Sequence, residues 1–223
     1  MKYKTCISIA EKTPDKINQK LKIALRKSDY VEVRFDFLKV EQIPETLELI
    51  KKDLTRIVCT LRPKKEGGKF SGSEKERIAI LKLIAEYNPF LLDVEFNTMN
   101  RDIALVKYLS LAKTKLLVSW HDFKKTPSSK ELEKKMRQMS KFSHNVKIVS
   151  TARSTDDATR MLELYSKKGK NNLISFSMGD FGRISRILCL YLGSPYTYVS
   201  LGKAVAPGQF SVNEIKKIIN LKK

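Results

Sequence analysis

Histidine and cysteine are scarce in this sequence of 223 residues, which contains two histidines and three cysteines. His121 and His144 are separated by polar sequence and match no metal-binding motif such as H-E-x-x-H, so we expect no catalytic metal. The cysteines, Cys6, Cys59 and Cys189, form no C-x-x-C pair, and each lies in an apolar segment. We therefore expect buried thiols in a reducing compartment rather than disulfides or a zinc site.

Long apolar runs are absent as well. No run approaches the roughly 18 residues that a membrane span requires, and the apolar stretch within residues 1–10 is too short for a secretory signal. No linker, internal repeat or low-complexity tract interrupts the chain. We therefore expect a single cytoplasmic domain over residues 1–223, with no membrane contact.

Acidic residues are few relative to basic ones, which gives a formal net charge of +20. Such a charge is typical of proteins that bind nucleic acid or another polyanion. The lysines are nevertheless spread over nearly every segment of helical periodicity, and no RNA-binding aromatic motif or zinc finger accompanies them. We interpret the charge as a solvated surface that also attracts a small anionic substrate, and we expect no nucleic-acid partner. A basic protein that binds RNA or DNA is the alternative.

Eight short apolar runs alternate with segments of helical periodicity. Strand followed by helix, repeated in this way, predicts a (β/α)8 TIM barrel, an α/β fold that commonly takes about 200 to 250 residues. The predicted strands are residues 4–8, 30–34, 56–60, 90–95, 115–120, 146–152, 173–178 and 196–200. Capping signals mark helix starts at Thr13-Pro14, Ser73 with Glu76, Ser128, Ser129, Ser154, and Ser211 with Glu214.

Two neighbouring strand-like runs, residues 116–123 and 146–152, each carry one ionisable residue, His121 or Lys147. Their β-branched, apolar composition is typical of buried parallel strands. Burial disfavours the ammonium form of a lysine, and a neutral amine is the nucleophile that condenses with a ketone. On adjacent strands the two backbones would be about 4.8 Å apart. A base and an imine-forming amine would then act on one substrate.

Charged residues also follow the alternation of two other predicted strands. Glu32, Arg34 and Asp36 fall on one face of residues 30–36, which predicts a polar cluster in the barrel interior. A buried ion-pair cluster with a purely structural role is the alternative. Asp93 and Glu95 share a face of the fourth strand, and the sequence does not decide which way that face points.

Three loops follow predicted strands, where barrels carry their functional residues. Glu66 offers a carboxylate that could fold back and hold a histidine in one tautomer. Residues 178–186 form a glycine-containing loop that enters a helix, and Arg186 there could bind a carboxylate through a bidentate pair. Residues 202–209 have hinge-like glycines and the composition of a lid, although a plain connection to the last helix is equally compatible.

Together these motifs resemble those of type I 3-dehydroquinate dehydratase, a Schiff-base enzyme family of the shikimate pathway. The resemblance covers almost the whole chain, and the motifs follow the family's order. They are Glu32-Val-Arg-Phe-Asp36, Arg62-x-x-x-Glu66-Gly-Gly68, His121-Asp-Phe-x-Lys-Thr-Pro127, Lys147, Met178-Gly-x-x-Gly-x-x-Ser-Arg186 and Ala206-Pro-Gly-Gln209.

The resemblance implies conversion of 3-dehydroquinate to 3-dehydroshikimate and water, with no metal or other cofactor, by a homodimer of (β/α)8 barrels. Lys147 matches the family's imine-forming lysine, His121 its general acid and base, and Glu66 the carboxylate that orients the histidine. The implied substrate-binding residues are Glu32, Arg34 and Arg62 on the hydroxyl side of the substrate, and Arg186 and Gln209 near its carboxylate and the closing lid.

Val205 departs from the family pattern, because bacterial members often have serine four residues before the final glutamine. We expect a lid hydroxyl contact to be missing here, while the covalent chemistry stays intact. The nearest alternative on the same fold is a Schiff-base aldolase acting on a sugar phosphate. Such an enzyme would need a phosphate-binding glycine loop rather than groups that bind a carboxylate.

Overall fold

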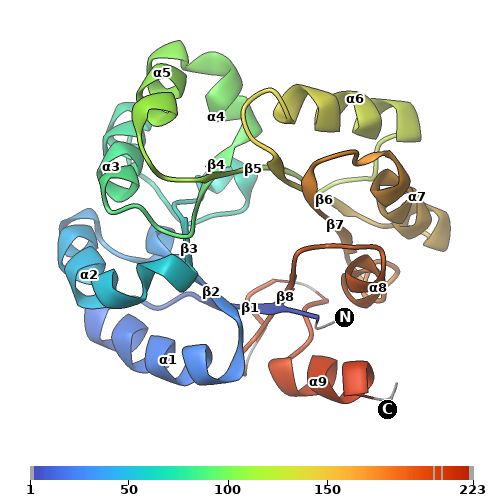
Figure 1. Ribbon diagram of the computed structural model, residues 1–223, viewed down its shortest axis with the longest axis horizontal. Helices are drawn as coiled ribbons and strands as arrows, with labels where there is room; N and C mark the ends of the chain where they lie inside the picture. Colours follow the sequence, from blue (N-terminus) through green and yellow to red (C-terminus); the bar gives the residue numbers. More distant parts are fainter. Residues whose placement is uncertain (1–2, 203, 207, 221–223) are drawn as a thin grey trace. The chain divides into compact units, whose positions relative to one another are not determined.

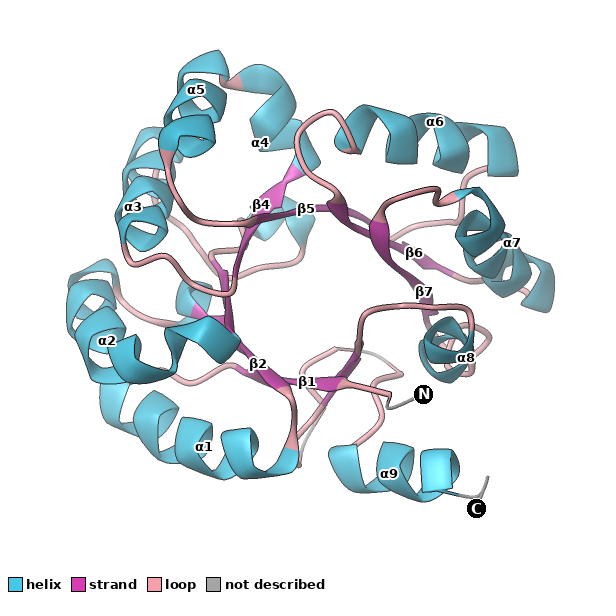
Figure 2. Ribbon diagram, in the orientation of Figure 1, coloured by secondary structure: helices cyan, strands magenta, loops and turns pink. Residues whose placement is uncertain are grey.

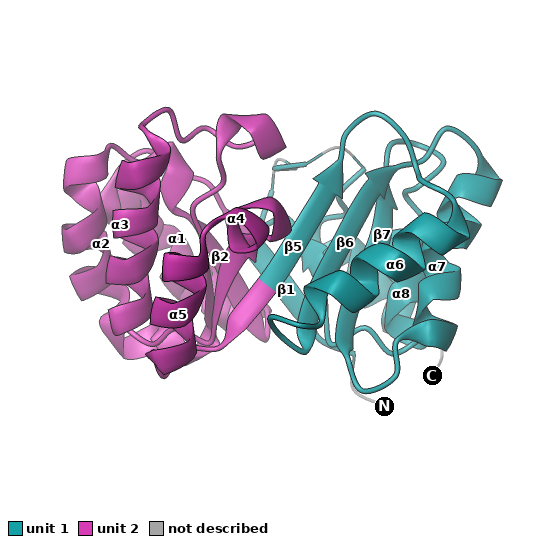
Figure 3. Cartoon of the chain, turned by 90° about the horizontal axis from the view of Figure 1, so that it is seen from above, with its two compact units in different colours: residues 1–7, 118–223 teal, residues 8–117 magenta. Residues whose placement is uncertain are grey.

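Strands and helices alternate along the whole described chain (Figure 1, Figure 2). The computed structural model describes residues 3–202, 204–206 and 208–220. It divides into two compact units (Figure 3). Unit 1 comprises residues 1–7 and 118–223, and unit 2 comprises residues 8–117.

The described part of the chain contains eight strands, one for each predicted run, with bounds that differ from the predictions by at most two residues. The strand prediction is therefore confirmed. The strands are β1 (Thr5–Ile9), β2 (Tyr30–Arg34), β3 (Ile57–Thr60), β4 (Leu91–Glu95), β5 (Leu116–Asp122), β6 (Asn145–Thr151), β7 (Asn172–Met178) and β8 (Thr197–Val199).

Helices fill the connections between these strands. The α-helices are α1 (Pro14–Lys27), α2 (Ile43–Ile50), α3 (Glu74–Glu86), α4 (Phe96–Arg101), α5 (Ile103–Leu111), α6 (Ser129–Met139), α7 (Thr155–Lys167), α8 (Ser185–Tyr191) and α9 (Val212–Asn220). Short 3-10 helices are η1 (Phe35–Phe37), η2 (Val40–Gln42), η3 (Lys51–Arg56) and η4 (Lys64–Glu66). Ser128 caps α6 and forms a capping box with Glu131, whereas Ser129, also predicted as a cap, is the first residue of the helix.

Unit 2 is built on the neighbouring strands β2, β3 and β4, which pair in parallel. Helix α1 buries one apolar face that includes Ile17 and Leu21. In helix α3, Ile78 is partly exposed, whereas the preceding residue, Arg77, is buried. An arginine therefore occupies a core-facing position of this helix.

Unit 1 contains β6, β7 and the part of β5 from Val118 onward, which are neighbours in the sheet, together with the part of β1 up to Ile7, which pairs in parallel with β8. Strands β6 and β7 pair in parallel along their full length, from Asn145 opposite Asn172 to Thr151 opposite Met178. Helices α7 and α8 both pack against β7, and α6 packs against β6 (Figure 2). The strands are buried almost throughout, which explains their continuous apolar sequence.

The three cysteines are buried free thiols, as predicted. Among the residues that the structure describes, no helix combines the length and the apolar character needed to cross a membrane.

Candidate active site

Lys147 lies in the middle of β6 with only 6% of its surface exposed. Alternation along the strand places Lys147 and Val149 on one face and Val146 and Ile148 on the other. The parallel register sets Val149 opposite Phe176 of β7, so the face that carries Lys147 continues onto Phe176. The amine is thus held on a rigid, buried sheet rather than on a loop.

Two basic side chains and two aromatic rings lie in a row beside this face, in the order Lys147, Tyr198, Phe176 and Arg186. The Nζ of Lys147 lies 4.4 Å from the centroid of the Tyr198 ring. The ring centroids of Tyr198 and Phe176 are 6.4 Å apart, and the guanidinium carbon of Arg186 lies 4.4 Å from the Phe176 centroid. Aromatic faces attract cations, and the attraction is stronger where water is excluded. Each cation therefore has a ring that stabilises its charge.

Arg186, in the first turn of α8, is 2% exposed. Burial lowers the pKa of its guanidinium to about 10, although Cys189 raises it. The loop before α8 passes close to the end of β7, because a Cβ added to Gly182 would lie 2.6 Å from the carbonyl oxygen of Met178 and from the Cβ of Ser177. A desolvated guanidinium gains most from an anion that accepts its hydrogen bonds, such as a carboxylate.

His121 lies near the end of β5 and is half-buried, with its ring centroid 6.0 Å from that of Phe123. Strand β5 is a hydrogen-bonded neighbour of β6, which carries Lys147. The adjacency predicted for these two strands is therefore confirmed. The loop after β5 is fastened to β6, because the hydroxyl oxygens of Thr126 and Ser150 lie 2.7 Å apart and share a hydrogen bond.

Gln209 is buried and organises the segment predicted as a lid. Its Oε1 accepts hydrogen bonds from the backbone N–H groups of Val205, at 2.9 Å, and Ala206, at 3.3 Å. The side chain thus holds the backbone of its own loop. Lys203 and Pro207 of the predicted lid lie outside the described residues.

Both ends of this loop are joined through one residue. The N–H of Ser200 donates to the carbonyl of Phe210, and the N–H of Val212 donates to the carbonyl of Ser200, each at 2.9 Å. Arg183 covers the ring of Phe210 at 4.3 Å and pairs with Glu214 at 3.2 Å. The segment between β8 and α9 is therefore anchored at its two ends.

In unit 2, Arg62 follows β3 and is buried between two acidic residues of β4. Its Nη1 donates to Glu95 and its Nη2 to Asp93, both at 2.7 Å. Burial lowers the pKa of the Arg62 guanidinium, but the nearby Asp93 and Glu95 carboxylates outweigh this effect and raise the pKa overall. The shared face of Asp93 and Glu95, which the sequence left undecided, is the one that meets Arg62.

Arg77 of α3 is a buried residue that sequence reasoning missed. Its Nη1 donates to Glu95 at 2.6 Å, and its guanidinium also binds Glu74 at 2.7 Å and the hydroxyl of Thr98. Glu95 thus bridges Arg77 and Arg62. The one local signal is Glu74, three residues earlier on the same helix, which by itself indicates an ordinary surface pair.

Only two of the three residues in the predicted cluster, Glu32 and Arg34, lie on the second strand. Strand β2 ends at Arg34, and Asp36 lies in η1. Arg34 nevertheless forms a bidentate pair with Asp36, with both distances 2.7 Å. The Asp36 carboxylate also accepts the N–H of Lys69 at 2.9 Å, while Glu32 accepts the hydroxyl of Thr60 at 3.0 Å. The charged groups are therefore held in fixed positions.

Glu66 ends η4 and accepts a 3.0 Å hydrogen bond from the Nδ2 of Asn97. The pKa of Glu66 is raised to about 7, mainly by burial. The nearby Arg62 opposes this rise, and Glu95 adds to it. A side chain at Gly68 would collide with the carbonyl of Arg62, because an added Cβ would lie 1.9 Å from that oxygen. The loop is therefore folded tightly, and Glu66 can both give and accept a proton near neutral pH.

The predicted site residues are divided between the two units. Unit 1 contains Lys147, His121, Arg186 and Gln209. Unit 2 contains Glu32, Arg34, Arg62 and Glu66. Sequence reasoning missed Arg77, Asn97 and Tyr198. Each has one partner that is distant in the chain: Glu95, Glu66 and Lys147, respectively. Tyr198 could have been found from strand alternation only if the neighbours of β8 had been known.

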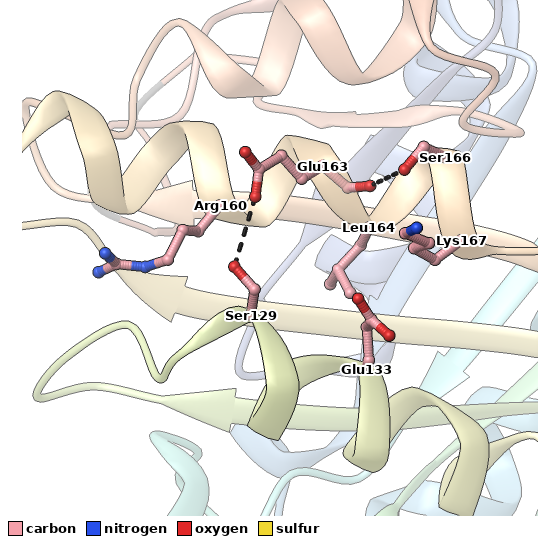
Figure 4. Close-up of a pocket in the computed structure, with 7 residues that line it drawn as sticks. All are labelled: Ser129, Glu133, Arg160, Glu163, Leu164, Ser166 and Lys167. Atoms are coloured by element: carbon pink, nitrogen blue, oxygen red, sulfur yellow. Dashed lines mark hydrogen bonds between the residues drawn. The ribbon is translucent and has the colours of Figure 1, made fainter.

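A separate surface groove of about 250 Å³ lies between α6 and α7 (Figure 4). Ser129 and Glu163 form a 3.4 Å hydrogen bond across it, and none of the predicted site residues lines it. Within the described ranges, no group of three or more His, Cys, Asp or Glu side chains is arranged to hold a metal ion.

Comparison with known proteins identifies the family. A sequence model described as Type I 3-dehydroquinase matches residues 5–223. The 3-dehydroquinate dehydratase of Methanococcus maripaludis strain C7 is 36% identical over 220 residues, which cover 97% of this chain and 98% of that protein.

Two solved structures are similar over nearly the whole chain. The 3-dehydroquinate dehydratase of Geobacillus kaustophilus superposes with a TM-score of 0.90 at 23% identity, covering 99% of this chain and 91% of that one. This similarity shows that the fold is a (β/α)8 TIM barrel, as predicted. The type I enzyme of Clostridium difficile with covalent modified comenic acid gives a TM-score of 0.85 at 26% identity, covering 99% and 92%.

Proposed function

Because the chain belongs to the type I 3-dehydroquinase family, we propose that it converts 3-dehydroquinate to 3-dehydroshikimate and water through a Schiff base on Lys147. The chain is thus a hydro-lyase, and its reaction is a step of the shikimate pathway of aromatic amino acid biosynthesis. The single observation that carries the mechanism is the position of Lys147, an amine buried in the middle of β6.

Lys147 is the nucleophile in this mechanism. Its amine adds to the substrate ketone, and loss of water forms a protonated imine. The imine withdraws electrons and acidifies the adjacent C–H bond. Its rigid, largely apolar surroundings support this role, because a nucleophile on a strand is held in register with the bound substrate. The covalently modified ligand carried by the Clostridium difficile relative is compatible with a reactive residue in the family.

His121 is the general base and then the general acid. It removes the proton from the acidified carbon, which gives a neutral enamine, and it returns the proton to the departing hydroxyl, which leaves as water. The conjugated imine that remains is hydrolysed to release the product and the free amine. The place of His121 near the end of β5, beside β6, supports this assignment.

The remaining residues bind the substrate in this proposal. Arg186 and Gln209 are assigned to its carboxylate, and the low exposure of both supports binding with little water present. Glu32, Arg34 and Arg62 are assigned to its hydroxyl groups. Glu66 is a catalytic carboxylate.

The proposal includes four further features. The length and composition of the sequence lead us to expect that the protein is cytoplasmic and that residues 1–223 form one domain. The resemblance implies that no metal ion or nucleotide cofactor takes part and that two copies form a homodimer. Sedimentation equilibrium of the purified protein tests the last of these, because a monomer at micromolar concentration would contradict it.

The decisive experiment is intact mass spectrometry after borohydride reduction, with and without 3-dehydroquinate, followed by peptide mapping. A reduced adduct on Lys147 is expected, and Lys147→Ala should form none. His121→Ala should form some adduct but show no turnover, measured as absorbance of the conjugated enone product. A folded wild-type sample that forms no adduct would rule out the imine mechanism, and near-normal turnover in either variant would remove that residue from its role.

A further inference from the structure

The ring of Tyr198 lies beside the atom that is proposed to react. The Lys147 Nζ is 4.4 Å from the Tyr198 centroid, a distance at which an aromatic face attracts a cation. Tyr198 is 4% exposed and Lys147 is 6% exposed, so little water screens this attraction. Under such conditions a cation–π pair stabilises the cation more than it does at an exposed site.

Strand geometry and neighbouring rings keep Tyr198 in this position. The ring is fixed by two aromatic neighbours, since its centroid lies 5.5 Å from that of Tyr196 at 73° and 6.4 Å from that of Phe176 at 60°. Tyr198 also stands opposite the buried Cys6 in the parallel pairing of β8 with β1. A ring held on three sides loses little conformational freedom when a cation forms beside it.

We propose that Tyr198 is a positioning residue for the Schiff-base reaction, and that its ring face stabilises the positive charge carried by the Lys147 nitrogen in the imine intermediates. This inference rests on the proposed function. The nitrogen is positive in the protonated imine formed from substrate and lysine, neutral in the enamine after His121 takes the proton, and positive again once the hydroxyl has left as water. The ring therefore favours the two cationic intermediates over the neutral one between them.

Phe176, in the same row of residues, should have a different effect on the kinetics from that of Tyr198. Phe176 lies under Arg186 at 4.4 Å, where the proposed task is to bind the substrate carboxylate. Loss of the Phe176 ring should therefore raise KM, whereas loss of the Tyr198 ring should lower kcat and the amount of trapped imine. A purely structural role for the two rings would affect both quantities alike.

The test measures the fraction of the chain reduced by borohydride at saturating 3-dehydroquinate, together with kcat and KM. Tyr198→Phe keeps the ring face and should stay within about twofold of wild type in all three. Tyr198→Leu removes the ring and should lower kcat and the trapped fraction about tenfold, with KM changed less than about threefold. Tyr191→Leu is the matched control, because this partly exposed tyrosine packs on Tyr3, with 4.8 Å between the ring centroids, and it should leave the trapped fraction at the wild-type value.

A fluorinated series makes the test independent of folding. Phenylalanine analogues with increasing ring fluorination at position 198 keep the shape of the ring but weaken its quadrupole, so the trapped fraction should fall in the order of fluorination. A constant trapped fraction across the series would overturn the inference. A Tyr198→Phe variant as impaired as Tyr198→Leu would also overturn it, because the hydroxyl would then be the active group. Absence of any adduct in the wild-type protein would instead contradict the proposed function.

Discussion

The side-chain amide of Asn97 donates a 3.0 Å hydrogen bond to the Oε1 of Glu66. That bond lowers the pKa of a carboxyl group whose burial raises it to about 7. Replacing Asn97 with alanine removes a donor that favours the carboxylate form, so the pKa of Glu66 should rise further. Because the proposed role needs the carboxylate, the acid limb of kcat/KM against pH should move to higher pH by about half a unit to one unit.

The pH profile of Asn97→Ala should be compared with that of Asn100→Ala, an exposed asparagine on the same helix. The control should leave the limb in place. An unmoved limb in both variants would show that Glu66 is not the group that titrates in the profile.

Glu66 also makes stability depend on pH. Its pKa is raised from 4.5 to about 7 in the folded protein, so the folded state binds a proton more tightly than the unfolded chain. The resulting contribution to stability is fully present below about pH 4.5 and is lost as the pH rises through about 7. Glu66→Gln should therefore raise Tm relative to wild type at pH 8 and change it little at pH 4.5. Differential scanning calorimetry at both pH values measures this, with Glu45→Gln, at an exposed glutamate of the same unit, as control.

Removal of Arg77 should unfold the protein more easily. Arg77→Met leaves the buried Glu95 with one guanidinium instead of two and should cost about 3 to 5 kcal/mol of unfolding free energy, measured by urea denaturation. Arg160→Met breaks a helical pair with Asp157 in which the arginine is 34% exposed, and it should cost less than about 1 kcal/mol. Equal losses in the two variants would mean that the contacts of Arg77 add nothing to those of a surface pair.

The lid position Val205 can be tested directly. Val205 uses its backbone N–H to bind Gln209, so a serine side chain there leaves that hydrogen bond in place. If a lid hydroxyl contact is missing in this protein, Val205→Ser should lower KM several-fold, by up to about 1.5 kcal/mol of binding, with kcat nearly unchanged. Steady-state kinetics measures both constants, and identical values in the two proteins would mean that the absence of serine has no effect.

Strands and helix starts could be predicted from the sequence because their signals are local. Strand β6 has a continuous apolar run, and the Ser128 cap with Glu131 needs only residues within one turn. The end of strand β2 was harder to predict. Alternation predicts that Asp36 continues the strand, but the chain turns into η1, where Asp36 binds both Arg34 and the N–H of Lys69.

Two contacts of unit 2, those of Arg77 with Glu95 and of Asn97 with Glu66, could not be predicted, because they join residues that are distant in the chain. From the sequence alone, Arg77 has the pattern of a surface residue on an amphipathic helix. Only the structure shows that Glu95, 18 residues later, lies beside it. Asn97 likewise meets Glu66 across 31 residues. Composition carries no signal for such pairs. Lys147 and His121 were easier, since an ionisable residue inside an apolar run is conspicuous before any partner is known.

The hydrogen bonds that Ser200 makes to Phe210 and Val212 bring the two ends of the intervening loop together on the scaffold. A loop whose two ends are joined in this way can be replaced as a unit, because its length and side chains can change while β8 and α9 keep their places. Chimeras that carry this segment from a relative should therefore fold as well as the parent protein. If this loop acts as the proposed lid, selection can change substrate binding there separately from Lys147, the lysine proposed to form the covalent intermediate.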